Sequence, residues 1–188
     1  MNKTTISTHK LVVAAMLAAL TAVGSALRIT VPIDIAGTSS FHLGNILCAL
    51  SGILLGPWMG GLAAGLGSAI YDMFNPLYIS ECWLTFLMKG AYGLAAGLAI
   101  RCGGKDWGYA KALIATVTGA VTYAVIYLAK SFFYSGMLMK GLTAQAAALT
   151  VITKIPATTF NAAIAIICAP FLAMNIRAAL EHNRLTLD

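Results

Sequence analysis

The sequence predicts an all-α integral membrane protein with six transmembrane helices. The apolar composition, the low share of charged residues and the length of the apolar runs predict this class. Of the 188 residues, 60% are hydrophobic and only 10% are charged, and the mean hydropathy is +0.85. A soluble domain usually carries about 25% charged residues, so this chain has too few charges to cover a surface that faces water. Its apolar runs approach the roughly 20 residues that a membrane-crossing helix needs.

Six apolar runs divide the chain, and together they form one predicted membrane domain over residues 1–188. Backbone polar groups inside a bilayer must bond within their own segment, which favours helices for runs of this length. The second and third runs are short, and Pro57 with its flanking glycines predicts a tight turn between them. We expect the spans at about 9–28, 41–56, 58–75, 82–100, 110–134 and 145–175.

The distribution of lysine and arginine predicts that both termini face the cytoplasm. Cytoplasmic loops of membrane proteins carry an excess of these residues. The opposite orientation leaves Arg28 and Lys140 as the clearest inside charges. With the N-terminus inside, the cytoplasmic face instead holds Lys3, Lys10, Arg101, Lys105, Lys111, Arg177 and Arg184.

Polar and aromatic side chains gather in the predicted outer half of five helices, whereas the inner halves are almost purely apolar. Polar residues are costly inside a membrane and usually mark a site, a pathway or an ion pair. A channel would carry polar side chains along its whole length, so this pattern predicts a cup that opens to the outside. The candidate substrate-binding residues are His42, Asn45, Asp72, Trp83, Lys89, Tyr127, Lys130, Lys154, Thr158 and Asn161.

The charged candidates also have a structural interpretation. Asp72 and Glu81 can pair with Lys89 in a purely structural cluster of charges. Lys130 and Lys154 then have no acidic partner left, which favours a ligand that carries a carboxylate or phosphate. Both interpretations stay open from the sequence alone.

Other candidates have equally simple structural explanations. His42 fits an ordinary interfacial histidine, and Asn161 fits a hydrogen bond to a neighbouring helix. Tyr134 fits an aromatic belt at the membrane surface, whereas Tyr127 lies deeper and is the better site candidate. The segment 29–40, "ITVPIDIAGTSS", is expected to be a loop with a short extended piece, placed so that it can close over the cup.

The sequence shows no catalytic or metal-binding pattern. We find no GxxxxGK[ST], no HExxH and no Ser/His/Asp set, so we expect neither enzyme activity nor a cofactor. The four cysteines have no paired spacing, which argues against a disulfide or zinc site. The net charge of +6 suggests contact with anionic lipid and not with nucleic acid.

The first span carries a face of small residues that suits close helix contact. Ala14 and Ala18 form one row at a spacing of four, and Ala15 and Ala19 form the adjacent row. Small side chains let helices approach closely in membranes. The face therefore either docks a partner helix or packs inside the bundle.

Taken together, these features resemble the substrate-specific S component of an energy-coupling factor (ECF) vitamin transporter. The resemblance covers essentially the whole chain and includes its length, its six spans and the AxxxA pattern of the first span. Its most characteristic parts are "FHLGNILCALSGILLGPWMGGLAAGLGSAIYD" at 41–72 and "KIPATTFNA" at 154–162.

The resemblance implies a function and partners. The protein would bind a B-type vitamin or precursor on the outer side of a bacterial cell membrane, beneath the loop between the first two spans. It would deliver this cargo with a transmembrane coupling protein and two cytoplasmic ATPase subunits, which hydrolyse the ATP. Docking to the coupling protein would use Ala14, Ala15, Ala18 and Ala19. Candidate substrates are pantothenate, folate, cobalamin, pyridoxine and hydroxymethylpyrimidine, and the lysines lean toward the first two.

Two other classes stay open. A stand-alone secondary transporter of a small polar solute would need coupling-ion residues and usually an inverted repeat, and no internal repeat is evident. A membrane scaffold or a small integral enzyme is the other alternative, and the polar outer halves and the missing catalytic pattern argue against each of these in turn.

Overall fold

Six α-helices and one β-hairpin make up the part of the chain that the computed structural model describes, residues 7–33, 37–102, 104 and 106–183. The order of the six helices agrees with the sequence prediction. The helices are α1 (Thr8–Ala26), α2 (Gly44–Leu55), α3 (Pro57–Met73), α4 (Cys82–Arg101), α5 (Tyr109–Lys130) and α6 (Ala144–His182).

Four segments are long and apolar enough to cross a membrane: Thr8–Ala26, Ile79–Arg101, Tyr109–Met139 and Ala144–His182. The apolar exterior of these segments supports the membrane class, since large side chains such as Leu11, Ile114 and Phe171 are exposed. The remaining two helices are shorter. It therefore stays a prediction that α2 and α3 also cross the membrane, which would make six spans in total.

Helix α2 forms the centre of the bundle. Its 12 residues are buried almost all round, which is typical of a core helix and not of one that faces lipid. The predicted tight turn to α3 is confirmed, with Gly56 at a φ of +81° and Pro57 as the first residue of α3. Only glycine adopts that backbone conformation at no steric cost.

Helices α2, α3 and α4 approach one another through glycines. A Cβ atom added to Gly93 of α4 would lie only 2.6 Å from the carbonyl oxygen of Gly60 in α3. A Cβ on Gly52 of α2 would in turn clash with the carbonyl oxygen of Gly93. This close backbone contact holds the centre of the fold together without large side chains.

The segment between α1 and α2 forms an antiparallel hairpin, which corrects the expectation of a loop. Strand β1 (Arg28–Ile33) pairs with β2 (Gly37–His42), and Arg28 lies opposite His42. The β-branched residues of β1 favour an extended chain, and the sequence analysis recognised that piece. It missed the partner strand because "GTSSFH" has no alternation of apolar residues.

Two helices extend beyond their predicted bounds. Helix α5 continues into the π-helix η2 (Ser131–Met139), so the helical segment ends five residues after the expected position. Helix α6 is 39 residues long and contains Pro156 and Pro170. It ends seven residues after the predicted end of the sixth span. A short 3₁₀ turn, η1 (Ile79–Glu81), precedes α4.

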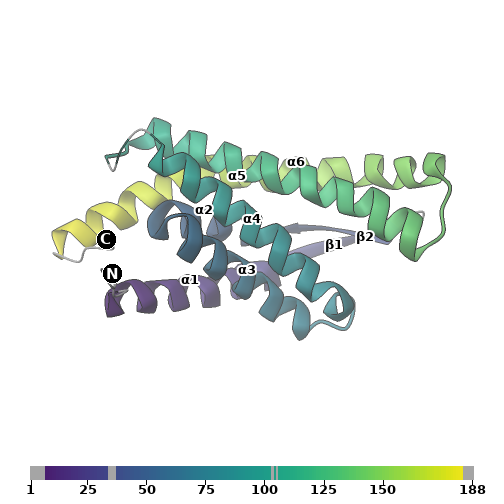
Figure 1. Ribbon diagram of the computed structural model, residues 1–188, viewed down its shortest axis with the longest axis horizontal. Helices are drawn as coiled ribbons and strands as arrows, with labels where there is room; N and C mark the ends of the chain where they lie inside the picture. Colours follow the sequence, from purple (N-terminus) through teal and green to yellow (C-terminus); the bar gives the residue numbers. More distant parts are fainter. Residues whose placement is uncertain (1–6, 34–36, 103, 105, 184–188) are drawn as a thin grey trace, which may run out of the picture.

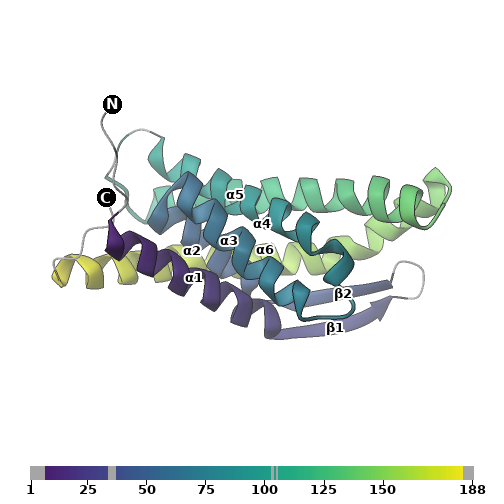
Figure 2. The ribbon, with the colours of Figure 1, turned by 60° about the horizontal axis from the view of Figure 1, so that its bottom comes forward.

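The bundle has two distinct ends. The start of α1 and the end of α6 lie at one end, which we call the terminal end, together with the connection between α4 and α5 (Figure 1). The hairpin and the connection between α5 and α6 lie toward the other end, which we call the hairpin end. Figure 2 shows β1 continuing directly from α1 in that direction. The start of α1 and the end of α6 thus share one end, as the predicted six spans would place them.

Candidate functional site

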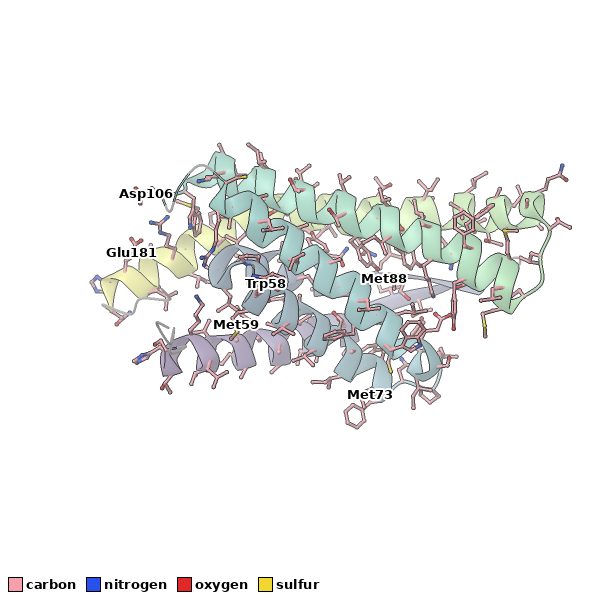
Figure 3. The ribbon with its side chains drawn as sticks, viewed as in Figure 1. Trp58, Met59, Met73, Met88, Asp106 and Glu181 are labelled. Carbon is pink, nitrogen blue, oxygen red and sulfur yellow. The ribbon has the colours of Figure 1, made fainter. Side chains whose placement is uncertain are left out.

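A cavity of about 280 Å³ lies in the half of the bundle nearer the hairpin end. The hairpin, η1, η2 and every helix except α2 contribute described residues to its wall. Met88 of α4, which lines the cavity, lies near the middle of the molecule (Figure 3). A polar cavity confined to one half of a bundle matches the predicted cup.

Most of the predicted site residues meet at this cavity. Asn45 and Trp83 do not line it. Asn45 lies buried behind the wall, where its side-chain oxygen accepts a hydrogen bond from the Lys89 ammonium group. Trp83 is 53% exposed and packs edge-to-face on Tyr134 outside the cavity. The residues in the wall are His42, Asp72, Lys89, Tyr127, Lys130, Lys154, Thr158 and Asn161.

The ion pairs differ from the expected cluster. Asp72 lies 4.0 Å from the guanidinium group of Arg28, and Glu81 pairs with Lys130. Lys89 instead donates to Asn45 and forms no salt bridge with Asp72 or Glu81. The sequence interpretation treated Arg28 only as a loop charge, although its position directly after α1 puts it against α3.

Lys130 and Lys154 therefore differ, against the expectation that both lack an acid. Lys130 has Glu81 as its partner. Lys154 donates to the hydroxyl oxygen of Ser131 at 3.3 Å and forms no salt bridge with a described carboxylate.

Stacked tyrosines of α5 form one side of the cavity. The ring centroids of Tyr123 and Tyr127 lie 5.6 Å apart with an angle of 16° between the rings. The Lys89 ammonium lies 4.0 Å from the centre of the Tyr123 ring, and the Lys154 ammonium lies 5.5 Å from that of Tyr127. Such cation–π contacts help to hold charged groups away from water. Tyr123 and Tyr127 are four residues apart, which places both rings on the same face of α5.

Asn161 connects α6 to the hairpin. Its side-chain oxygen accepts from the backbone N–H of His42 at 2.9 Å, and its side-chain N–H donates to the carbonyl oxygen of Ser40 at 2.8 Å. Next to it, the rings of Phe41 and Phe160 pack edge-to-face at 5.1 Å. The sequence suggested a ligand contact or a bond to a helix, whereas this amide binds the backbone of β2.

Arg28 fixes the base of the hairpin and was missed as a site residue. Its guanidinium lies 4.2 Å from the ring centre of Tyr71 and 4.8 Å from that of Tyr78. Its Nε–H donates to the carbonyl oxygen of Ser25 at 2.8 Å. Together with Asp72, these contacts hold the start of β1 against the cavity wall.

The four alanines of the predicted docking face divide into two rows. Ala14 is buried and Ala18 is partly buried, because the backbone of Ala18 packs directly on Gly67 of α3. Ala15 and Ala19 are exposed on the outside of α1. One row thus packs inside the bundle, and the other is accessible to a partner.

An apolar exterior that encloses a polar cavity defines a membrane protein that binds a small solute. The family model described as "ECF-type riboflavin transporter, S component" matches residues 5–178. The chain belongs to this family, so the predicted resemblance to an ECF S component is confirmed, although riboflavin was not among the predicted candidate substrates. It is a multi-pass protein of the cell membrane and the substrate-binding subunit of a vitamin transporter, and it is not an enzyme.

A curated relative aligns with part of the chain. An uncharacterised protein of Pyrococcus woesei, from the region 3′ of its gap gene, is 29% identical over 118 residues. The alignment covers 63% of this chain and 74% of the relative.

Proposed function

We propose that the chain binds a compact aromatic B-type vitamin, or its precursor, in the cavity at the hairpin end. The observation that carries this proposal is the wall itself, which combines stacked tyrosines with many hydrogen-bonding groups. A flat ring stacks on Tyr127, and the polar groups around it orient the substituents of that ring. Ligand pockets are usually lined mostly by apolar groups with a few polar ones, so the many polar groups of this wall favour a ring with several polar substituents.

The cavity volume narrows the choice of vitamin. About 280 Å³ lies at the lower end of the range for small-molecule sites, roughly 300–1,000 Å³. This volume speaks against cobalamin, whose corrin ring needs more space. The tyrosine wall favours ligands with a flat ring over pantothenate, which has none. Riboflavin is the first ligand to test because the family description names it, and pyridoxine, hydroxymethylpyrimidine and folate follow.

We propose further that uptake needs an ATP-driven module. The described residues contain no nucleotide-binding loop and no group of metal ligands, so the chain carries no evident energy source of its own. A transmembrane coupling protein with two cytoplasmic ATPases supplies it, and the exposed row of Ala15 and Ala19 is the contact surface. In this arrangement the hairpin end faces outward and the terminal end faces the cytoplasm.

The first experiment is mass spectrometry of the small molecules released when the gently purified full chain is denatured. A stoichiometric aromatic vitamin is the expected result, and titration of that vitamin into the empty protein then gives its affinity. For riboflavin, the change in flavin fluorescence follows binding. A protein that releases none of the candidate vitamins and binds none of them in titration contradicts the proposal.

A transport assay distinguishes the proposal from a stand-alone secondary transporter. Uptake of the bound vitamin is measured in cells that express the chain with and without the coupling protein and ATPases. We expect uptake only with the complete module. Equal uptake without any ATPase would favour the secondary transporter.

A further inference from the structure

The cavity wall carries more positive than negative charge. Two buried lysines, Lys89 and Lys154, line it, and its two carboxylates, Asp72 and Glu81, form their salt bridges with Arg28 and Lys130. The other two described carboxylates, Asp106 and Glu181, lie at the terminal end, away from the cavity (Figure 3). Buried cations are costly unless an anion balances them. Within the described chain, the balancing charge for this wall is incomplete.

Lys154 is the clearest case among these cations. Lys154 is only 9% exposed and lies in α6, a long helix of this apolar bundle. An ammonium group has three N–H donors, and the hydrogen bond to Ser131 uses one of them with a neutral partner. The remaining donors favour an acceptor with negative charge, because charge-assisted hydrogen bonds are about twice as strong as neutral ones.

A second observation points to the same place. The hydroxyl oxygen of Ser135 lines the cavity, is buried and has no hydrogen-bond partner. A buried hydroxyl without a hydrogen-bond partner is destabilising, so an unsatisfied group of this kind needs an explanation. Ser135 belongs to η2, and π-helical turns occur frequently at functional sites.

The register between η2 and α6 brings the two groups to one site. Lys154 contacts Ser131, and the Cβ of Ala147 lies 3.0 Å from the position of a Cβ added to Gly136. The two segments are therefore antiparallel, and Ser135 lies in η2 four residues, or about one helical turn, after the Ser131 that Lys154 contacts. One turn is about 5.4 Å, which a single carboxylate or phosphate group bridges.

We propose that Lys154 and the Ser135 hydroxyl form an oxyanion subsite between α6 and η2, and that the transported vitamin carries a carboxylate or phosphate group there. This inference rests on the proposed function, since the remainder of the vitamin occupies the same cavity. It specifies the chemical class of substrate: among the candidates, folate carries carboxylates, whereas riboflavin, pyridoxine and hydroxymethylpyrimidine would bind as their phosphate esters and more tightly than in their neutral forms.

The test uses inorganic phosphate and acetate as probes on the full chain in detergent, at constant ionic strength set with chloride. We expect a saturable rise in the unfolding temperature with at least one probe. Tighter binding of phosphate indicates a phosphate ester as the natural group, and tighter binding of acetate indicates a carboxylate. No saturable effect of either probe on the wild-type protein overturns the inference.

Three variants locate the effect. Lys154→Met should weaken probe binding at least tenfold, whereas Lys111→Met, a lysine of the terminal end that bonds backbone carbonyls, should leave it unchanged. Ser135→Ala should weaken probe binding about threefold with no loss of stability without the probe, because its oxygen has no partner to lose. If Lys154→Met does not fold, Ser135→Ala alone still tests the inference. Probe binding that is unchanged in these two cavity variants overturns the inference.

The outcome also separates this inference from the proposed function. A chain that binds a neutral vitamin but neither probe retains the proposed function and loses the oxyanion subsite. A chain that binds a probe through Lys154 but releases and binds no vitamin retains the subsite and loses the proposed function.

Discussion

At the scale of single residues, the cavity wall shows how one side chain decides the position of a whole segment. The amide of Asn161 is 6% exposed and uses both its oxygen and its N–H on the backbone of β2. Its role is therefore to hold the hairpin against α6, next to any ligand. The sequence placed this residue at the site but not its partners, because a hairpin remote in sequence supplies them.

Replacing Asn161 by alanine should loosen the hairpin. Each lost hydrogen bond leaves a backbone group of β2 without its partner, at a cost of about 1–3 kcal/mol. We expect faster hydrogen exchange of the β2 amides and a lower unfolding temperature. Asn175→Ala is the matched control on the same helix, since its exposed side chain bonds only the carbonyl oxygen one turn back. Equal exchange in both variants would show that Asn161 does not anchor the hairpin.

Tyr127 makes a second prediction at this scale. An aromatic pair contributes about 0.5–1.5 kcal/mol beyond its buried area, so Tyr127→Leu should weaken vitamin binding roughly twofold to tenfold. Tyr127→Phe keeps the ring and should bind nearly as the wild type does. Tyr109→Leu, at the opposite end of α5, should have no effect. Titration of the purified proteins measures all three, and an unchanged affinity in Tyr127→Leu would remove stacking from the proposed site.

At the scale of elements, the order of the helices was predictable because long apolar runs allow few alternatives in a membrane. Which face of its helix a residue lies on was harder to predict. Trp83 lies at the predicted depth, yet it is on the outer side of α4, whereas Lys89 faces the cavity. Depth follows from position in a run, but the face depends on which neighbours the helix meets.

The glycine contact between α3 and α4 gives a prediction for elements. Gly93→Ala places a Cβ atom 2.6 Å from the carbonyl oxygen of Gly60, so the two helices must separate. Overpacking of this kind costs about 1–3 kcal/mol. Gly90→Ala is the control on the same helix, where the added atom would lie at an ordinary 3.5 Å. Thermal unfolding should show a lower midpoint for the first variant only, and equal midpoints would contradict the close contact.

At the scale of the whole molecule, the sequence predicted a cup in one half of the bundle, and the structure has a cavity there. Composition by depth was sufficient for that conclusion, because lipid excludes unpaired polar groups wherever the protein does not enclose them. The pairing of charges was not predictable. Asp72 forms its salt bridge with Arg28 and not with Lys89, and Glu81 forms its salt bridge with Lys130. Both salt bridges join residues that are more than 40 positions apart in the sequence, so they depend on how the chain folds.

The exposed row of α1 gives a prediction about assembly. Ala19→Trp should prevent close approach of a coupling protein and abolish uptake, while vitamin binding by the isolated chain stays unchanged. Val121→Trp, on the exposed side of α5, is the control and should leave uptake intact. Co-purification with the coupling protein measures the contact directly. Normal uptake by Ala19→Trp would exclude this row as the docking surface.

The shortness of α2 has a consequence for the distance over which cargo must move. This helix starts two residues after His42 in the cavity wall and runs toward the terminal end for 12 residues, or about 18 Å. The hydrocarbon layer of a bilayer is about 30 Å thick. With the end of α2 at the inner boundary of this layer, a solute bound beside its start would have about 18 Å of hydrocarbon left to cross. On the proposed function, the coupling module would then act over roughly that distance and not over the full thickness.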